Sequence, residues 1–270
     1  MKNLNGLVIL IRGAGELASG VAHRLYSCHF RLCLTEIDQP QAVRRMVSFC
    51  EAVYDGEKEV EGVTAKLVHS PEEITLAWRE DKIPLLVDPK AGIRNALKPD
   101  VLVDAILAKK NLGTSIKDAR LVIGLGPGFT AGKDVHAVIE TNRGHNLGRM
   151  ILSGGAEPNT GIPGEIAGLT AERVFRAPRA GKFLNVKEIG DYVQAGDVVA
   201  TVQGEPVKAL IHGVLRGLLR DGTEVYKGMK AGDVDPRDNK ENCYTISDKA
   251  RAIGGGVLEA ILYHFNRNED

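Results

Sequence analysis

The chain has 270 residues, which suits one large domain or two smaller ones. Its 35 Lys and Arg residues balance 35 Asp and Glu residues, so it lacks the basic excess typical of proteins that bind nucleic acid or membrane surfaces. No apolar run approaches the roughly 18 residues of a membrane-spanning helix, and the short apolar run near the N-terminus does not fit a signal peptide, so we expect a cytoplasmic protein.

The first predicted elements are a strand over residues 7–11, a glycine-rich turn and a helix. The turn, GAGELA, fits the G-x-G-x-x-G/A pattern of dinucleotide sites. A second strand, residues 32–36, ends in an acid 23 positions after Gly13, where such sites place a carboxylate on a ribose hydroxyl. The alternative is a tight turn that binds no ligand. The predicted nucleotide-binding residues of this region are Gly13, Gly15, Ala18 and Glu36.

Strands and helices continue to alternate along the first half of the chain. A short helix is expected over residues 40–46, strands over 67–69 and 85–88, and a helix with Ser70 as N-cap and Pro71 at its first position. This alternation predicts an α/β fold with a Rossmann-like parallel sheet. Ligands bind beyond the carboxyl ends of the strands in such sheets, so the turns at these ends should meet along one edge.

The stretch over residues 121–149 combines an apolar strand, a loop with four glycines between residues 124 and 132, and many polar groups, which favours the floor of a small-molecule site. In an extended segment, alternate residues share a face, so Asp134, His136 and Glu140 would point the same way if the strand is unbroken. We favour a polar cofactor head over a metal ion, because no pair of His or Cys ligands supports a metal site. A structural ion-pair network, plain turn chemistry and a buried core histidine remain the alternatives. The candidate cofactor-binding residues here are Gly124, Gly126, Gly128, Asp134, His136, Glu140, Arg143 and His145.

The pattern changes near residue 170. Two copies of G-x-x-V-x-x-G, at 190–196 and 222–228, lie among short predicted strands and indicate an internal duplication of a small β unit. This duplication resembles the biotinyl/lipoyl-like barrel-sandwich, here with a structural or docking role rather than a modified lysine. We therefore predict a Rossmann-like domain over 1–170, a small β barrel-sandwich over 171–236, and a C-terminal helix over 237–270 that packs back on the first domain.

The C-terminal helix is expected to begin with a capping box at Thr245 and Asp248. Three consecutive glycines, at 254–256, interrupt its apolar face. Since each mid-helix glycine costs about 0.5–1 kcal/mol relative to alanine, the triplet indicates either a break or a close approach to a ligand or another helix. The four cysteines form no C-x-x-C pair, so neither a zinc site nor a disulfide framework is indicated.

Three stretches carry a resemblance to a known family: GAGELASGVAHRL, GLGPGFTAGKDVHAVIETNRGHNLGR and SGGAEPNTGIPGEI. They resemble the YqeB-type accessory proteins of selenium-dependent molybdenum hydroxylases, relatives of the XdhC/CoxI maturation factors, over nearly the whole chain. The resemblance implies a Rossmann-like domain and a role in maturing a molybdenum enzyme by handling its cofactor or a sulfur or selenium ligand. The implied partner is a xanthine dehydrogenase-like apo-enzyme. No catalytic residues come with the resemblance.

Three functions therefore compete. The first is an accessory protein that binds the molybdenum cofactor in a nucleotide-containing form, whose pyrophosphate a helix N-terminus favours. The second is an NAD(P)-dependent oxidoreductase, and the third is a structural subunit that docks through its β unit. Whether the protein catalyses a reaction, and whether it forms a homo-oligomer, stays open at this point.

Overall fold

A computed structural model describes residues 4–266 and divides them into two compact units. The first, here called the sheet unit, comprises residues 4–40, 48–159 and 246–266 of the described chain. The second, the two-sheet unit, comprises Gln41–Val47 and Thr160–Thr245. The chain thus enters the two-sheet unit twice, first through a seven-residue segment that sequence patterns did not separate from its surroundings.

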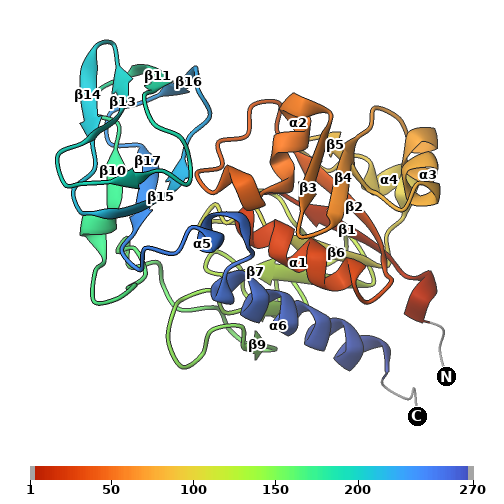
Figure 1. The fold of residues 1–270 in the computed structure, drawn as a ribbon. Coiled ribbons are helices and arrows are strands. Elements are labelled where there is room, and N and C mark those ends of the chain that lie inside the picture. Colours follow the sequence, from red (N-terminus) through yellow and green to blue (C-terminus); the bar gives the residue numbers. More distant parts are fainter. Residues whose placement is uncertain (1–3, 267–270) are drawn as a thin grey trace. The chain divides into compact units, whose positions relative to one another are not determined.

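The sheet unit contains one nine-stranded sheet in the order β3-β4-β5-β2-β1-β6-β7-β8-β9 (Figure 1). The strands are β1 (Val8–Arg12), β2 (Arg31–Glu36), β3 (Glu57–Val60), β4 (Val63–Leu67), β5 (Ile83–Val87), β6 (Val101–Asp104), β7 (Leu121–Leu125), β8 (Ala137–Ile139) and β9 (Met150–Ile151). The helices are α1 (Glu16–Tyr26), α2 (Ala52–Asp55), α3 (Pro71–Arg79), α4 (Arg94–Leu97) and α6 (Asp248–Phe265), with short 3-10 turns at Leu4–Gly6 and Phe49–Glu51.

Parallel pairing runs from β4 through β8, and the edge strands β3 and β9 are antiparallel to their neighbours. Within this sheet, the strand order β5-β2-β1-β6-β7-β8 is the 3-2-1-4-5-6 order of doubly wound dinucleotide-binding sheets. The central strands are buried over nearly their whole length, as continuous apolar runs in parallel sheets require. The expectation of an α/β protein with a large, mainly parallel sheet is therefore confirmed.

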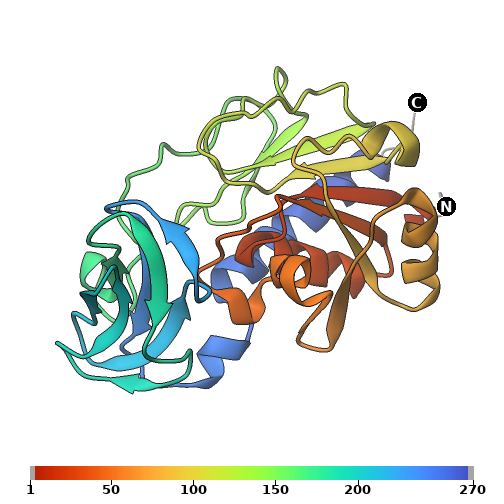
Figure 2. The same cartoon turned by 90° about the horizontal axis from the view of Figure 1, so that it is seen from above.

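Helices cover both faces of this sheet. One apolar cluster joins strand residues such as Leu10 and Val122 to Ile74 and Ala77 of α3. Helix α3 begins as expected, with the Ser70 side chain accepting a hydrogen bond from the Glu73 N–H at 3.3 Å. Helices α1 and α6 pack against each other, α1 along β1 and β2, and α6 along β7 and β8 (Figures 1 and 2).

Helix α6 runs without a break through the glycine triplet. A Cβ atom at Gly254 would lie 3.1 Å from the Gly20 carbonyl oxygen of α1, and one at Gly256 would lie 2.1 Å from the Gly148 carbonyl oxygen. A Cβ at Gly255 would meet nothing within 4 Å. Two of the three glycines therefore permit close packing of α6 on its neighbours, and the alternative of a helix break is wrong. The predicted capping box is wrong too, because the N-cap of α6 is Ser247, whose side chain accepts from the Ala250 N–H.

The two-sheet unit contains two four-stranded sheets, β10-β17-β15-β12 and β14-β13-β11-β16, whose strands pair antiparallel. Its elements are η2 (Arg45–Val47), η4 (Ala171–Arg173), β10 (Val174–Arg176), β11 (Gly181–Asn185), β12 (Tyr192–Val193), β13 (Val198–Val202), β14 (Glu205–Lys208), β15 (Gly213–Leu218), β16 (Thr223–Val225), β17 (Lys230–Asp235) and α5 (Glu241–Tyr244). The helix expected over residues 40–46 reduces to the 3-10 turn η2.

The two copies of the G-x-x-V-x-x-G motif have matching environments. The N–H groups of Gly190 and Gly222, the first glycines, each donate to a strand carbonyl at 2.8 Å. The valines in the middle, Val193 and Val225, are both buried in the apolar core of the unit. These equivalent contacts support an internal duplication, whereas the identification with a lipoyl-like barrel-sandwich stays a prediction.

No helix among residues 4–266 combines the length and the apolar character needed to cross a membrane.

Candidate functional site

The glycine turn between β1 and α1 lies where the order of the strands reverses. Strand β1 is flanked by β2 on one side and β6 on the other, and the chain crosses from one half of the sheet to the other at this point. Such a switch point opens a crevice at the carboxyl ends of the strands, where ligands bind in doubly wound sheets. The turn therefore occupies the position that the sequence motif requires.

The two glycines of the turn do different things. Gly13 has φ +96°, and a Cβ there would lie 3.0 Å from the Ala105 carbonyl oxygen after β6, so this glycine allows the turn to pack on the neighbouring strand. Gly15 has an ordinary φ of −70° and is the N-cap of α1, with no side chain to cap the helix. A Cβ at Gly15 would meet nothing within 4 Å. Open space thus adjoins Gly15 at the positive end of α1, where a phosphate can approach the backbone.

Glu36 closes the other side of this turn. Its carboxylate accepts hydrogen bonds of 2.8 Å from the Ala14 N–H in the turn and from the Ile37 N–H. Burial raises the pKa of Glu36 above its ordinary value, and the bonds from Ile37 and Ala14 partly offset that shift. An ionised carboxylate has about four lone-pair sites, so two bonds leave acceptor capacity for a ligand hydroxyl. Ala18, the last residue of the motif, is buried on α1.

A buried ion pair joins the ends of β1 and β6 next to the glycine turn. Arg12, the last residue of β1, donates to the carboxylate of Asp104, the last residue of β6, at 3.1 Å. Thr114 bridges the pair, because its hydroxyl accepts from Arg12 and donates to Asp104 at 2.6 Å. The charge of Arg12 is thus balanced by Asp104 within the fold, and the pair links the two strands of the switch point.

The three candidate glycines within and just after β7 have packing roles. A Cβ at Gly124 would lie 2.5 Å from the Phe129 ring. Gly126 has φ +73°, and a Cβ there would lie 2.5 Å from the Thr141 hydroxyl oxygen. Gly128 has φ +112°, and its Cβ would lie 2.7 Å from the Lys110 backbone. At all three positions, neighbouring atoms leave no room for a Cβ, which agrees with the alternative of plain turn chemistry. Contact of these glycines with a cofactor stays a prediction.

The acids and the histidine that follow do not form one extended face. Strand β8 covers only Ala137–Ile139, so Asp134 and Glu140 lie outside it. Asp134 closes a turn by accepting from the Thr130 N–H at 2.9 Å. Glu140 is almost fully buried and accepts from the N–H groups of Thr141, Asn142 and Glu157, each at 2.7 Å. Each carboxylate therefore organises the loop around it, and the unbroken strand on which the shared face depended is not present.

The remaining candidates of this stretch face different surroundings. Arg143 makes a two-pronged ion pair with Asp248 in the first turn of α6, at 2.8 and 2.7 Å. His145 is exposed. No group of three or more His, Cys, Asp or Glu side chains within residues 4–266 is arranged to hold a metal ion.

His136 takes the place of a backbone acceptor in the sheet. The ring Nδ1 of His136 accepts a hydrogen bond from the backbone N–H of Val122 in β7 at 2.9 Å. The backbone N–H of His136 donates to the Val122 carbonyl at 2.8 Å. The ring also lies 5.9 Å from the ring of His264 on α6. Burial lowers the pKa of His136 below its ordinary value. An accepting Nδ1 must be unprotonated, and the lowered pKa favours this neutral form of the imidazole.

We expect His136 to make the protein less stable in mild acid. A histidine whose folded-state pKa is depressed contributes stability above its unfolded-state pKa, about 6.5, and that stability is lost as pH falls below it. The free energy of unfolding in urea, measured between pH 7.5 and 5, should decline less steeply for His136→Asn, whose amide oxygen accepts the same hydrogen bond without titrating. Equal declines for both proteins would contradict this role.

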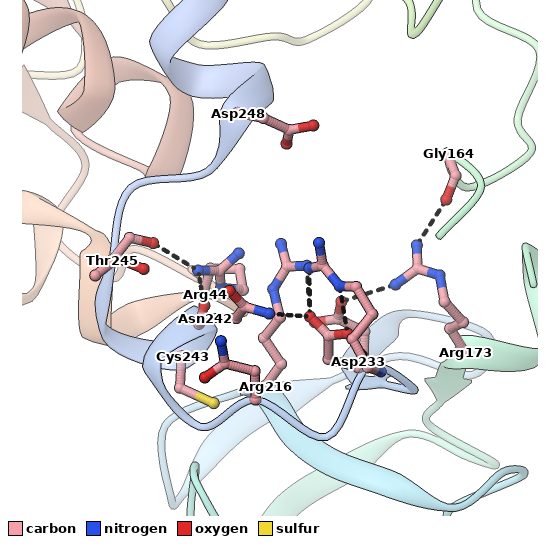
Figure 3. Close-up of polar contacts among 12 residues, drawn as sticks. Arg44, Gly164, Arg173, Arg216, Asp233, Asn242, Cys243, Thr245 and Asp248 are labelled. Atoms are coloured by element: carbon pink, nitrogen blue, oxygen red, sulfur yellow. Dashed lines mark hydrogen bonds and ion pairs between the residues drawn. The ribbon is translucent and has the colours of Figure 1, made fainter. Parts of the chain in front are cut away.

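The two-sheet unit contains a cluster of buried arginines and aspartates that sequence patterns did not reveal (Figure 3). Arg173 donates to Asp233 at 3.2 Å and to the Gly164 carbonyl at 2.8 Å. Asp235 accepts from Arg216 at 3.3 Å and from Arg237 at 2.6 Å. Although burial opposes the shift, the hydrogen bonds from Arg237 lower the pKa of Asp235 to about 2.

Segment 41–47 contributes to the same cluster. The Arg44 guanidinium donates to the carbonyls of Asn242 and Thr245, at 2.8 and 3.3 Å. The only sequence signal for this cluster was the D-V-D alternation at the end of β17, which would ordinarily indicate an exposed strand face. Both aspartates are buried instead, because arginines from distant parts of the chain surround them.

The mainly parallel sheet and its helices define an α/β protein, and comparison with known proteins adds a relative. No protein-family model matches the chain. Over 255 residues, 94% of this chain, the sequence is 52% identical to "Uncharacterized protein YqeB" of Escherichia coli (strain K12). The match covers 47% of that protein, so this chain spans about half the length of the curated relative.

Solved structures add no argument. The chain is similar to the ectoine utilization protein EutE (DoeB) from Ruegeria pomeroyi, with 12% identity, a TM-score of 0.27 and 85% of each chain covered. It is also similar to an aspartoacylase family protein from Mesorhizobium loti, with 13% identity, a TM-score of 0.28 and the same coverage. Scores this low do not support a shared fold or activity.

Proposed function

We propose that this protein is an accessory factor in the maturation of a selenium-dependent molybdenum hydroxylase. In this proposal, its sheet unit binds a nucleotide-containing form of the molybdenum cofactor and transfers it to a xanthine dehydrogenase-like apo-enzyme. The sequence similarity to YqeB supports the family, and the motifs of the glycine turn and of residues 124–149 carry the resemblance. The observation that carries the binding step is the glycine turn at the switch point, with open space beside Gly15.

The residues of the crevice fit a pyrophosphate and a ribose. The uncapped N-terminus of α1 offers backbone N–H groups and a positive dipole end to a pyrophosphate. Glu36 lies within hydrogen-bonding reach of the turn and can accept from a ribose hydroxyl. Glu16, in the first turn of α1, adds a negative charge that opposes phosphate binding, so the contacts with the backbone have to outweigh it.

An NAD(P)-dependent oxidoreductase is the alternative function, and Glu36 is the observation that favours it. A carboxylate at the end of β2 accepts from the 2′-hydroxyl of NAD and repels the 2′-phosphate of NADP. Calorimetric titration of the protein with a pterin dinucleotide, NAD and NADP separates the proposals. Tighter binding of the pterin dinucleotide supports the accessory function, tighter binding of NAD supports the oxidoreductase, and binding of neither contradicts both.

The substitution Gly15→Val is expected to abolish binding of the dinucleotide while the protein stays folded. The new side chain fills the open space that a pyrophosphate needs, and it meets no protein atom within 4 Å of its Cβ. Calorimetry measures the binding, and the urea midpoint measures the folding. Gly255→Ala, on an open face of α6, is the matched control and should bind normally. Unchanged affinity in folded Gly15→Val protein would remove the turn from the site.

A co-expression experiment tests the biological step. The hydroxylase is produced together with wild-type protein, with Gly15→Val or with Gly255→Ala, and its activity and molybdenum content are measured. We expect both readouts to fall with Gly15→Val alone. Full activity and molybdenum content with Gly15→Val would contradict the proposed role of the crevice in maturation.

A further inference from the structure

A pocket lies at the amino-terminal ends of β2, β4 and β5, whereas the glycine turn follows the carboxyl end of β1. It has a volume of about 770 Å³, within the range of sites for small molecules. It is bounded by the end of α1, the start of β2, the turn between β3 and β4, and the end of α3. Arg31 begins β2 at this pocket and Glu36 ends the strand at the glycine turn, so the two sites are about 17 Å apart.

We propose that this pocket binds a small aromatic anion, meaning a planar ring that carries a carboxylate or a phosphate group. This site is independent of the nucleotide crevice and of the function proposed for it. Aromatic walls and guanidinium groups around the pocket carry the inference.

The aromatic walls are held in place by hydrogen bonds. The indole N–H of Trp78, on α3, donates to the Leu32 carbonyl at 2.7 Å. The hydroxyl of Tyr26, at the end of α1, donates to the Asp81 carbonyl at 2.9 Å. Burial and the neighbouring Asp81 raise the pKa of Tyr26 to about 12, so its hydroxyl stays protonated and can donate at neutral pH. Fixed aromatic surfaces bind a planar ring at a low cost in conformational entropy.

Two guanidinium groups at the pocket are available to an anion. Arg31 lies 5.9 Å from the centre of the Trp78 ring, and neither Arg31 nor Arg79 forms an ion pair with any residue of the described chain 4–266. A guanidinium presents paired N–H groups that match carboxylate and phosphate oxygens. An anion beside Trp78 would therefore meet two guanidinium groups that form no ion pair within the described residues.

The other charged groups of the pocket are already engaged. Lys82 is bound by Glu57 at 2.6 Å and lies 3.7 Å from Glu80. The Glu61 carboxylate accepts from Arg251 and from the Ile246 N–H, all at 2.8 Å. Asp81 is the remaining carboxylate of the lining, and the lining also contains the two arginines Arg31 and Arg79. Two positive charges and one negative charge therefore remain, which favours a negatively charged ligand.

Three lining residues also have left-handed backbone conformations. The φ angles are +63° for His29, +45° for Glu61 and +57° for Asp81. Such conformations cost free energy at residues other than glycine, and they cluster at binding sites. Here they occur at three separate turns that form the rim of one pocket.

Tryptophan fluorescence gives a direct test, because Trp78 is the single tryptophan of the chain. The intact protein is titrated with benzoate and phenyl phosphate, with benzyl alcohol as a probe without charge and inorganic phosphate as a probe without a ring. We expect saturable changes in fluorescence with the two aromatic anions and much weaker binding of the other two probes. If none of the probes gives a saturable change, or if inorganic phosphate binds as tightly as phenyl phosphate, the proposal is wrong.

Matched arginine variants locate the anion. Arg79→Gln is expected to weaken binding of both aromatic anions about tenfold, the effect of losing one charged hydrogen bond. Arg179→Gln removes the same charge at an exposed position of the two-sheet unit and should leave binding unchanged. Equal affinities of the two variants would overturn the placement of the anion at Arg79. Since the probes contain no nucleotide, Gly15→Val should bind them as the wild type does, which separates this site from the crevice.

Discussion

Gly256→Ala is expected to lower the free energy of unfolding by about 3 kcal/mol, at the upper end of what overpacking costs. The added methyl group would lie 2.1 Å from the Gly148 carbonyl oxygen and 3.0 Å from the Ile139 side chain. A backbone oxygen cannot move aside as a flexible side chain can, so either α6 or the loop before β9 must shift. The same substitution one residue earlier, Gly255→Ala, meets no atom within 4 Å.

Urea unfolding of both variants measures this contrast. Gly255→Ala should raise the free energy of unfolding by about 0.5–1 kcal/mol, because alanine favours the helix over glycine and no packing cost opposes it. The two substitutions are chemically identical and adjacent, so the difference between them isolates the packing of α6. Similar stabilities for the two variants would show that α6 does not approach the Gly148 loop this closely.

Asp233→Asn is expected to destabilise the two-sheet unit by about 3–5 kcal/mol, the usual cost of breaking a buried ion pair. Asp233 and Arg173 are each about 95% buried, and the substitution leaves the Arg173 charge without its carboxylate. Burial alone would raise the pKa of Asp233, but Lys230, Arg216 and the neighbouring arginines lower it overall.

The lowered pKa gives the prediction a second readout. A carboxylate whose folded-state pKa is depressed contributes stability above its unfolded-state pKa, near 4, and that stability is lost as pH falls through the folded-state value. Acid unfolding of the wild type should therefore include a contribution from Asp233 that is absent in Asp233→Asn. Asp238→Asn removes an exposed carboxylate nearby and serves as the control. A loss of stability no larger than that of the control would contradict the role of the pair.

The region from β1 to Glu36 could be predicted because its signals are local. Apolar runs, the glycine spacing and the position of the acid all lie within thirty residues, and the sheet places them as the motif requires. Ser70 and Pro71 likewise marked the start of α3, because a helix cap depends on the residues next to it.

The later site residues could not be assigned in this way because their partners are distant in the chain. A glycine is needed at position 128 because the Lys110 backbone leaves no room for a side chain. The charge of Arg143 is used in an ion pair with Asp248, 105 residues away. A glycine or an arginine in a polar loop gives no sign of which neighbour it serves. The same limit applies to Asp233, whose arginine partner Arg173 lies 60 residues earlier.

The path of the chain also limits how the protein can be divided. Between residues 40 and 48 it leaves the sheet unit to supply Gln41–Val47 to the two-sheet unit, where the Val43 carbonyl accepts from the Leu218 N–H at 2.9 Å. A fragment cut at Thr160 and Thr245 therefore lacks a piece of its own fold, although it looks like a contiguous module. Recombination at those two points would transfer the two-sheet unit without Gln41–Val47. We therefore expect the sheet unit and the two-sheet unit to stay together in one gene during evolution.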